Sequence, residues 1–439
     1  MKKGRFVALV ILCAMFALPP LVNVSSDIGA SDNIVVSKSF LESYDYHDQI
    51  WIQSDQEFHD QAAAELWDGD GSEGDPYIIT GYFFDCETQP LRVWHTTVYW
   101  IFTDNVIDGV GAVVQCGTWI ENATNGAIVD NEIFNRHVGI SISVSENFLV
   151  SGNYIHDCWG TGIELLVGSN KTIIKDNIIE DIGAAGIYSS TSKDCVVENN
   201  TISRTESLAI ALIGQAPNCN ISDNTISDCN SKGIMMSQTS NGFVTGNSIN
   251  DVVDIGIHMN GATESVIEDN SIGYVNGVGI RIVDGDDCLL LHNNIENCTE
   301  DGILVSSGTE SAIHCNSIRN VSAYAVKLGI GSSENSVSFN TFVENGVTKQ
   351  VCDDGLNNGV SKNYYSDWNS PDANSDGYVD SPYILDGTAG NQDDLPLAEA
   401  GVVPTIEPSQ GSNQMVILLI GGAAGVVILI AAALMIKRR

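Results

Sequence analysis

The chain has 439 residues, with 19 basic against 56 acidic residues, a formal net charge of -37 and a pI near 4.2. Such an acidic balance excludes a nucleic-acid-binding protein, because phosphate recognition needs a basic face. Hydrophobic residues make up 43% of the chain and charged residues 17%, which excludes a disordered acidic tail.

Residues 1–26 are predicted to be a secretory signal peptide. Lys2, Lys3 and Arg5 precede an apolar run from Phe6 to Leu18, which is the arrangement of such signals. An uncleaved N-terminal anchor is the alternative. The mature chain is therefore expected outside the cytoplasm.

Residues 27–80 are predicted to form an N-terminal segment with a helical cap. Ser54 and Glu57 have the spacing of a capping box. Four apolar residues after them share one helical face: Phe58, Ala62, Ala63 and Leu66. We expect a helix over 54–66 that covers the start of the repeats described next.

Residues 81–362 are predicted to be a solenoid. The motif Asn-x-Ile, or a close variant, recurs with spacings of 22 to 26 residues. It begins at Asn105, Asn131, Asn153, Asn177, Asn200, Asn224, Asn247, Asn270, Asn293, Asn316, Asn340 and Asn363. A Gly-Ile pair and a third apolar segment follow in most periods, so three short strands separated by turns make one rung. Because a rung cannot bury its apolar side alone, the rungs must stack. The predicted fold is an all-β parallel β-helix of about 12 rungs.

The repeated Asn residues are predicted to be structural. Asn tolerates the left-handed conformation that a sharp turn needs. Stacked Asn amides can also hydrogen-bond from rung to rung as a ladder. The Ile residues of Asn-x-Ile and Gly-Ile are expected to point inward.

The segment after the repeats carries a resemblance to a known family. It contains Asn363-Tyr364-Tyr365-Ser366-Asp367 and an Asp-rich stretch from Asp372 to Tyr383. With the repeats, these motifs resemble the NosD/CASH right-handed parallel β-helix proteins of the pectate-lyase-like superfamily. The stretch Trp67–Ile79 resembles the N-terminal segment of archaeal cell-surface members. The resemblance implies a right-handed β-helix and a role with carbohydrates, since CASH denotes carbohydrate-binding and sugar-hydrolase domains.

Residues 363–400 are predicted to be a C-terminal cap that contains a calcium loop. Oxygen donors at alternate positions beside a Gly match the first half of an EF-hand-like loop: Asp372, Asn374, Asp376, the carbonyl of Tyr378, and Asp380. The position that would hold the closing Glu is Tyr383. A turn without an ion is the alternative.

One row of outward residues is the predicted substrate-binding face: Glu164, Tyr188, His258, Arg281 and Lys327. The candidate catalytic group is a cation beside acids: Arg281, Asp284, Asp286 and Asp287. A solvated face of mixed charge is the alternative. Met235 and His258 occupy matching positions in neighbouring rungs, but the chain has only eight His and seven Met, so copper is not favoured.

Two covalent features are predicted for the exported part. Sequons place N-linked glycans at Asn122, Asn170, Asn220, Asn297 and Asn320. Cys195 and Cys219 occupy matching positions in consecutive rungs, which stack ~5 Å apart, so they can form a disulfide. Buried free thiols are the alternative.

The C-terminus is predicted to anchor the chain in a membrane. Residues 401–414 form a short linker, and residues 415–436 carry no charge and are long enough to span a bilayer. The tail 437–439 is basic and is expected in the cytoplasm. Six basic residues and no acids lie at the two ends, which leaves the exported part at about -43.

The sequence therefore predicts a single-pass surface protein that presents a β-helix outside the cell. Its expected partner is a glycan or surface polymer, in adhesion or envelope structure. A polysaccharide lyase or glycosidase and a NosD-like metal-linked accessory protein are the alternatives. Calcium is the expected cofactor.

Overall fold

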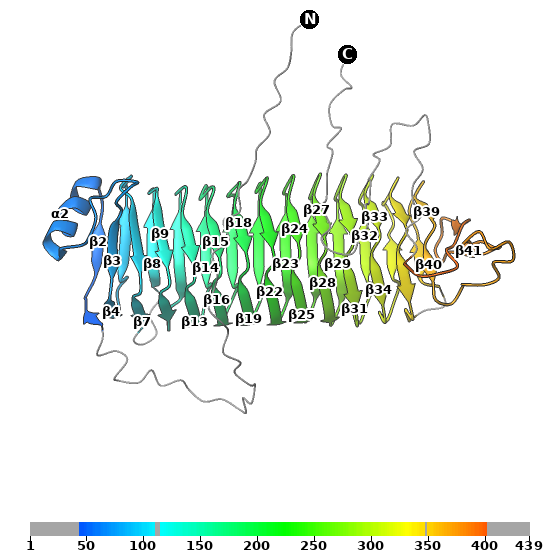
Figure 1. Cartoon of the computed structure of the whole chain (residues 1–439), viewed down its shortest axis with the longest axis horizontal. Coiled ribbons are helices and arrows are strands. Elements are labelled where there is room, and N and C mark those ends of the chain that lie inside the picture. The colour runs from blue at the N-terminus through cyan, green and yellow to red at the C-terminus, as the bar shows by residue number, and fades with distance from the viewer. Residues whose placement is uncertain (1–43, 110–114, 347–348, 402–439) are drawn as a thin grey trace, which may run out of the picture. The chain divides into compact units, whose positions relative to one another are not determined.

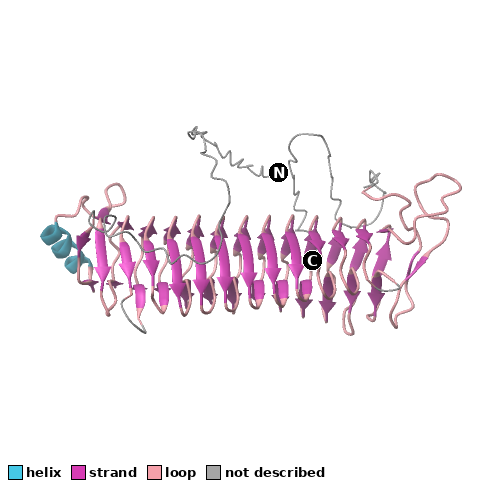
Figure 2. Ribbon diagram, turned by 90° about the horizontal axis from the view of Figure 1, so that it is seen from below, coloured by secondary structure: helices cyan, strands magenta, loops and turns pink. Residues whose placement is uncertain are grey.

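The computed structural model describes residues 44–109, 115–346 and 349–401. These residues form a parallel β-solenoid in which each rung gives one strand to each of three parallel sheets (Figures 1 and 2). The predicted all-β repeat fold is confirmed.

The first sheet has 14 strands, and its members after the first begin directly after Gly81 or after an Asn of the repeat. They are β1 (Asp45–Tyr46), β4 (Tyr82–Asp85), β7 (Val106–Asp108), β10 (Glu132–Phe134), β13 (Tyr154–Cys158), β16 (Ile178–Ile182), β19 (Thr201–Thr205), β22 (Thr225–Cys229), β25 (Ser248–Val252), β28 (Ser271–Val275), β31 (Asn294–Glu296), β34 (Ser317–Arg319), β37 (Thr341–Val343) and β40 (Tyr364–Tyr365).

The second sheet has 13 strands and contains the Gly-Ile segments. They are β2 (Ile50–Ile52), β5 (Leu91–Trp94), β8 (Cys116–Glu121), β11 (Val138–Ser143), β14 (Ile163–Leu166), β17 (Ile187–Ser190), β20 (Ile210–Ile213), β23 (Lys232–Ser237), β26 (Ile255–Asn260), β29 (Val278–Val283), β32 (Ile303–Ser306), β35 (Val326–Leu328) and β38 (Val351–Asp353).

The third sheet also has 13 strands and contains the third apolar segment of each rung. They are β3 (Tyr77–Thr80), β6 (Trp100–Thr103), β9 (Gly126–Val129), β12 (Leu149–Ser151), β15 (Ile173–Lys175), β18 (Val196–Glu198), β21 (Asn220–Ser222), β24 (Phe243–Thr245), β27 (Val266–Glu268), β30 (Leu289–Leu291), β33 (Ala312–His314), β36 (Ser336–Ser338) and β39 (Gly359–Ser361).

The core is a stack of inward Ile residues from neighbouring rungs. Ile155 in β13 and Ile163 in β14 are both fully buried, as predicted for the two motifs. The Gly before the second Ile is needed for close stacking. A Cβ on Gly256 would lie 2.6 Å from the carbonyl oxygen of Gly279 in the next rung, closer than any side chain tolerates.

The Asn ladder is also confirmed. Asn224 is typical, because its Nδ2 donates to Asn247 Oδ1 at 2.9 Å, and that oxygen also accepts the Asn224 backbone N–H at 3.0 Å. The same pattern continues without a break from Asn105 to Asn363. Each ladder Asn is almost completely buried, so these hydrogen bonds satisfy polar groups inside the solenoid.

The prediction that the ladder Asn residues themselves are left-handed was wrong. The residue before each one has positive φ, for example Asp176 at 58° before Asn177 and Asp223 at 56° before Asn224. The bend lies one residue earlier because the Asn side chain must turn inward to reach the next rung.

The predicted helix is present as α2 (Asp55–Glu65), at the N-terminal end of the solenoid (Figure 1). Ser54 Oγ accepts the Glu57 N–H at 3.2 Å, and the Glu57 carboxylate accepts the Gln53 N–H at 2.8 Å. Phe58 and Ala62 are buried as expected. Two face residues were placed wrongly: Ala63 is exposed, and Leu66 is the left-handed C-cap, 86% exposed. The helix ends before Leu66 can turn inward.

The solenoid begins earlier than residue 81. Strands β1, β2 and β3 form a first rung, with α2 inserted between β2 and β3. This rung lacks the Asn-x-Ile motif, and the helix breaks its period, so the sequence pattern missed it.

The segment after Asn363 lies against the last rung, where a C-terminal cap was predicted. It contains an antiparallel pair, β41 (Tyr383–Ile384) and β42 (Gln392–Asp393). Tyr383 stacks on Tyr365 with ring centroids 3.7 Å apart, and the Leu397 N–H bonds to the Asn363 carbonyl at 2.9 Å.

The predicted signal peptide (1–26), membrane span (415–436) and tail (437–439), and all of the linker except Gly401, lie outside the described residues. Within the described ranges, no helix has the length and apolar character needed to cross a membrane.

Candidate functional site

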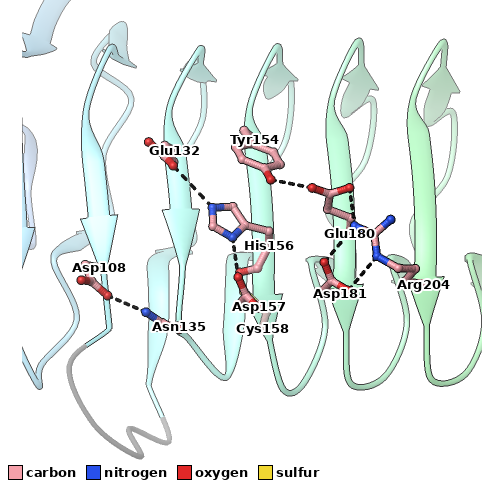
Figure 3. A network of polar contacts seen from close by, with 10 residues as sticks. All are labelled: Asp108, Glu132, Asn135, Tyr154, His156, Asp157, Cys158, Glu180, Asp181 and Arg204. Carbon is pink, nitrogen blue, oxygen red and sulfur yellow. Dashed lines mark hydrogen bonds and ion pairs between the residues drawn. The ribbon is translucent and has the colours of Figure 1, made fainter. Parts of the chain in front are cut away.

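A polar network covers the outward face of the first sheet over the consecutive strands β10, β13, β16 and β19 (Figure 3). Tyr154 and His156 lie on either side of the inward Ile155, so both point away from the core. In register, Tyr154 is beside Glu132, and His156 is beside Glu180. Residues 22 to 26 apart in sequence thus become neighbours on one face.

His156 is held between aromatic rings and carboxylates. Its ring stacks on Phe134 at 4.9 Å and on Tyr154 at 4.2 Å between centroids. Its Nδ1 lies 2.7 Å from Asp157 Oδ2, and its Nε2 lies 3.5 Å from Glu132 Oε1. Burial lowers the pKa of His156, but the hydrogen bonds to Glu132 and Asp157 outweigh burial and raise it above its usual value.

Arg204 in β19 binds two consecutive acids of the neighbouring strand β16. Its Nη2 donates to Glu180 Oε2 at 2.6 Å, and its Nε and Nη2 donate to the two Asp181 oxygens at 2.8 Å each. Tyr154 donates its hydroxyl proton to Glu180 Oε1 at 2.5 Å. The hydrogen bond from Arg204 lowers the pKa of Asp181, and burial together with Glu180 raises the pKa of Tyr154. Near neutral pH Asp181 is therefore a carboxylate, and Tyr154 keeps its proton.

An open groove of about 580 Å³ lies beside this network, along the turns that follow β13, β16, β19 and β22. Its polar lining includes Asp157, Asp181, Arg204, Glu206, Asp228 and Asn230. Trp159, 43% exposed, adds an aromatic surface. The groove offers carboxylate acceptors together with Arg204 and Asn230 as donors, which suit the hydroxyls of a sugar, and the neighbouring His156, whose pKa is raised, can donate a proton.

The predicted substrate-binding residues do form one row on the second sheet. Glu164 pairs in register with Tyr188, and His258 with Arg281. Lys327 is two strands beyond Arg281, with Leu304 between them. The row is polar only in patches, because Ala211 and Met235 separate Tyr188 from His258.

The candidate catalytic group is not assembled around its cation. Arg281 forms no ion pair with any described residue, including Asp284, Asp286 and Asp287. Asp286 instead accepts the Thr309 hydroxyl at 2.6 Å. The three acids follow β29 in the turn, beyond the strand that holds Arg281.

His258 is half-buried, and neither ring nitrogen has a hydrogen-bond partner in the described part of the chain. Burial, Lys232 and Arg281 lower its pKa to about 4. The two cations that disfavour a proton on His258 also disfavour a metal ion there, although Met235 lies next to it in register.

The donors of the predicted calcium loop bond mainly to its own backbone. Asp372 Oδ1 and Oδ2 accept the N–H groups of Asp376 and Gly377 at 3.2 and 3.1 Å. Asp380 accepts the Ala373 N–H at 3.0 Å, and Asn374 bonds to Asp376. No cluster of three or more His, Cys, Asp or Glu suited to a metal occurs among residues 44–109, 115–346 and 349–401. Calcium binding stays a prediction.

The predicted glycosylation sites lie at turns and in β21, and most of their amides have partners. Asn170 donates to Glu146 at 2.9 Å, Asn220 to Ser222 at 3.2 Å, and Asn320 to Asn297 at 2.5 Å. The Asn122 amide lies 2.7 Å from His95 Nδ1. A glycan would replace these contacts, and its attachment stays a prediction.

Cys195 and Cys219 are neighbours, as their spacing predicts. Both are buried free thiols, and each donates to a backbone carbonyl, Cys195 to Ser169 at 3.4 Å and Cys219 to Ser192 at 3.5 Å. A disulfide between them stays a prediction.

The network of the first sheet was not predicted from the sequence. Its signal was present at outward positions one and three residues after each ladder Asn, where Glu132, Tyr154, His156 and Glu180 stand. The prediction fell on the row of the second sheet instead, because the family resemblance implies a cation beside acids. The aromatic residues Trp51, Trp94 and Trp119 were not predicted as a site either, because Trp51 precedes the repeats and the other two lie before the rungs with a Gly-Ile pair.

Comparison with known proteins supports the fold. Residues 103–276 match a family model described as "Periplasmic copper-binding protein (NosD)", and residues 209–365 match "Right handed beta helix region". No curated protein sequence matches the chain significantly.

Two solved structures share the solenoid. The A-module of the mannuronan C-5 epimerase AlgE6 from Azotobacter vinelandii has a TM-score of 0.51 at 13% identity, covering 70% of this chain and 92% of that one. The catalytic domain of a GH87 alpha-1,3-glucanase in complex with tetrasaccharides has a TM-score of 0.51 at 14% identity, covering 74% and 66%. Such low identities show the fold alone. The resemblance to archaeal members stays a prediction.

Proposed function

Because the chain is a right-handed β-helix repeat protein of the NosD type, we propose that it is an extracellular carbohydrate-binding protein. It holds a glycan or surface polymer on the outward face of its solenoid, in adhesion or envelope structure. The observation that carries the proposal is the groove of about 580 Å³ beside the Tyr154–Glu180–Arg204 network.

The groove supplies the chemistry that sugar recognition needs. Arg204 can donate to hydroxyl oxygens, while Asp181 and Glu206 can accept from hydroxyl protons. Trp159 offers a face for the C–H side of a sugar ring. The solved structures of the same fold include enzymes named for polysaccharides, which agrees with a glycan as partner.

A membrane anchor at 415–436 and an export signal at 1–26 belong to the proposal, on the sequence evidence. They place the solenoid outside the cell and the basic tail 437–439 inside it. Calcium in the Asp372–Asp380 loop is the proposed cofactor.

The test is a binding screen of the full chain in detergent micelles against neutral and acidic glycans, with and without calcium. We expect Arg204→Ala to weaken binding by about tenfold or more. The matched control is Arg319→Ala, because Arg319 also pairs with an acid on the first sheet, Glu296, but lies outside the groove. Binding to no glycan, or equal affinity of both variants with the wild type, would contradict the proposal.

A second candidate is an enzyme that acts on polysaccharides, a lyase or glycosidase. The observation that favours it is a phenol 2.5 Å from Glu180 Oε1 and a His156 of raised pKa on the same face. These groups can act as general acid and base. The test is incubation with neutral and acidic polysaccharides, monitoring new reducing ends and unsaturated products.

The enzyme hypothesis predicts that Tyr154→Phe and His156→Gln abolish product formation. Loss of activity in Arg281→Ala alone would move the active site to the second sheet. No product from any polysaccharide would leave the binding function without catalysis. A NosD-like accessory role with a metal is the remaining alternative. Copper is not favoured near His258, because Lys232 and Arg281 repel a cation there.

A further inference from the structure

Three Trp residues surround one Arg on the outward face of the second sheet, at its N-terminal end. Trp51 in β2, Arg92 in β5 and Trp119 in β8 are register neighbours on consecutive strands. Trp94 lies two residues after Arg92 on the same strand and therefore on the same face. We call these four residues the Trp–Arg platform. It continues the row of Glu164 and Tyr188 toward the N-terminus.

The Arg92 guanidinium lies within cation–π distance of all three indoles. Its central carbon lies 3.6 Å from the ring centroid of Trp94, 4.6 Å from that of Trp119 and 4.7 Å from that of Trp51. The indoles meet edge to face, with Trp94 and Trp119 centroids 5.3 Å apart. These three contacts hold the guanidinium group against the indoles before any ligand arrives.

The hydrogen-bond donors of this cluster have no acceptor among the described residues. Arg92 donates no hydrogen bond to a described residue, and its Nε and the Trp94 Nε1 are buried without an acceptor in the described part of the chain. The pKa of Arg92 lies below its usual value, because burial lowers it more than the charge of Glu121 raises it. No ion pair within 4.0 Å joins Arg92 to Glu121. Arg204 and Arg319 differ from Arg92, since each binds a carboxylate directly, whereas Arg281 also has a buried Nε without a partner among the described residues.

An Arg that served packing alone would gain from an ion pair, because acids outnumber basic residues by 56 to 19. Arg92 instead keeps the polar edge of its guanidinium without a described partner, beside an indole of Trp51 that is 47% exposed. A flat aromatic surface next to fixed donors is complementary to a pyranose ring, which has an apolar C–H face and a rim of hydroxyls.

We propose that the Trp–Arg platform binds a pyranose unit of a neutral glycan, with Trp51 against the C–H face of the sugar and Arg92 donating to its hydroxyls. This inference rests on the proposed function and adds a second contact region on another sheet. A neutral sugar is favoured over a uronate because Glu121 pairs in register with Trp94 and the exported part is strongly acidic, so an anionic sugar would be repelled.

The test measures affinity of the full chain for neutral hexose oligosaccharides and for uronate oligosaccharides of equal length, by calorimetry and Trp fluorescence. We expect Trp51→Ala and Arg92→Lys to weaken neutral-oligosaccharide binding about tenfold or more. Arg92→Lys keeps the charge but loses the planar donor edge. The matched control is Phe243→Ala, because Phe243 is 42% exposed on the third sheet, away from the platform; it should leave affinity unchanged.

The outcomes separate this inference from the proposed function. Glycan binding that falls in Arg204→Ala but not in Trp51→Ala or Arg92→Lys would overturn the platform and keep the groove. Tighter binding of uronates, lost in Trp51→Ala, would overturn the neutral assignment. An equal loss in Phe243→Ala would overturn a specific role for Trp51. Absence of binding to any glycan would overturn both proposals.

Discussion

Asp393 completes the Asn ladder at Asn363. The Asp393 Oδ2 atom accepts the Asn363 backbone N–H at 2.9 Å and its Nδ2 at 3.3 Å. Every earlier ladder Asn finds these acceptors on the Asn of the next rung, but the last rung has none. Asp393, from the antiparallel pair after the solenoid, supplies a buried carboxylate in its place. Lys362 and Tyr365 also donate to it.

The first prediction concerns this closing contact. Asp393→Ala leaves buried donors of Asn363 without acceptors, so we expect a loss of about 3 kcal/mol or more in unfolding free energy. Chemical denaturation measures it. Asp394→Ala is the control, because Asp394 is exposed and bonds only to Gln392. Equal stability of the two variants would show that the ladder needs no terminal acceptor.

The second prediction concerns the interior of the ladder. Asn247→Ala removes the acceptor for the Asn224 N–H and the donor to the Ile221 carbonyl. Because these groups are buried, we expect about 3 kcal/mol or more of destabilisation. Asn230→Ala, at an exposed bend where the amide bonds to Glu206, should cost less than about 1 kcal/mol. A small effect at Asn247 would refute a stabilising role.

The third prediction is a pH dependence with opposite signs for two His residues. The folded-state pKa of His156 lies above the usual 6.5, whereas that of His258 is about 4. The stability contributed by charged His156 is full below pH 6.5 and is lost as the pH rises through its folded pKa. His258 has the opposite effect, because its folded state favours the neutral ring. The stability that neutral His258 contributes is full above pH 6.5 and is lost as the pH falls from 6.5 toward 4.

NMR titration of the His side chains checks both signs. Asp157→Asn should lower the pKa of His156, because it removes the carboxylate 2.7 Å from Nδ1, and should leave His258 unchanged. A His156 pKa at or below 6.5 in the wild type would contradict the hydrogen-bond geometry.

The fourth prediction concerns calcium in the Asp372–Asp380 loop. A ligand that binds only the folded state at about 100 times its Kd adds about 2.7 kcal/mol. We therefore expect a lower Tm in EDTA than in calcium, measured by scanning calorimetry. Asp376→Ala should abolish this difference, whereas Asp70→Ala, in another exposed acidic turn, should keep it. Identical melting with and without calcium would eliminate the ion.

Much of the fold follows from the sequence alone. Asn-x-Ile and Gly-Ile at a nearly constant spacing specify three short strands per rung, because only stacked rungs can bury Ile155 and Ile163 together. The Asn ladder follows as well. Because each rung carries an Asn at the same position, stacking brings its side-chain amide next to the amide of the following rung. The helix at Asp55–Glu65 was visible through its capping residues, which act locally.

The candidate sites depended on tertiary structure. The turns after β13, β16, β19 and β22 decide which outward face of the solenoid carries an open groove. No sequence motif encodes the paths of these turns. Arg204 reaches Glu180 and Asp181 only because rungs stack in a fixed register.

The Trp–Arg platform could not be predicted from the sequence. Trp51 and Arg92 are separated by 41 residues, far more than the regular spacing of 22 to 26, because α2 lies between their strands, and Trp119 follows Arg92 after 27 residues. Local patterns cannot align residues across such insertions. The sequence determined a stacked β-helix with a buried Asn ladder, since both repeat in every rung, whereas strand register and turn paths decided which outward side chains meet.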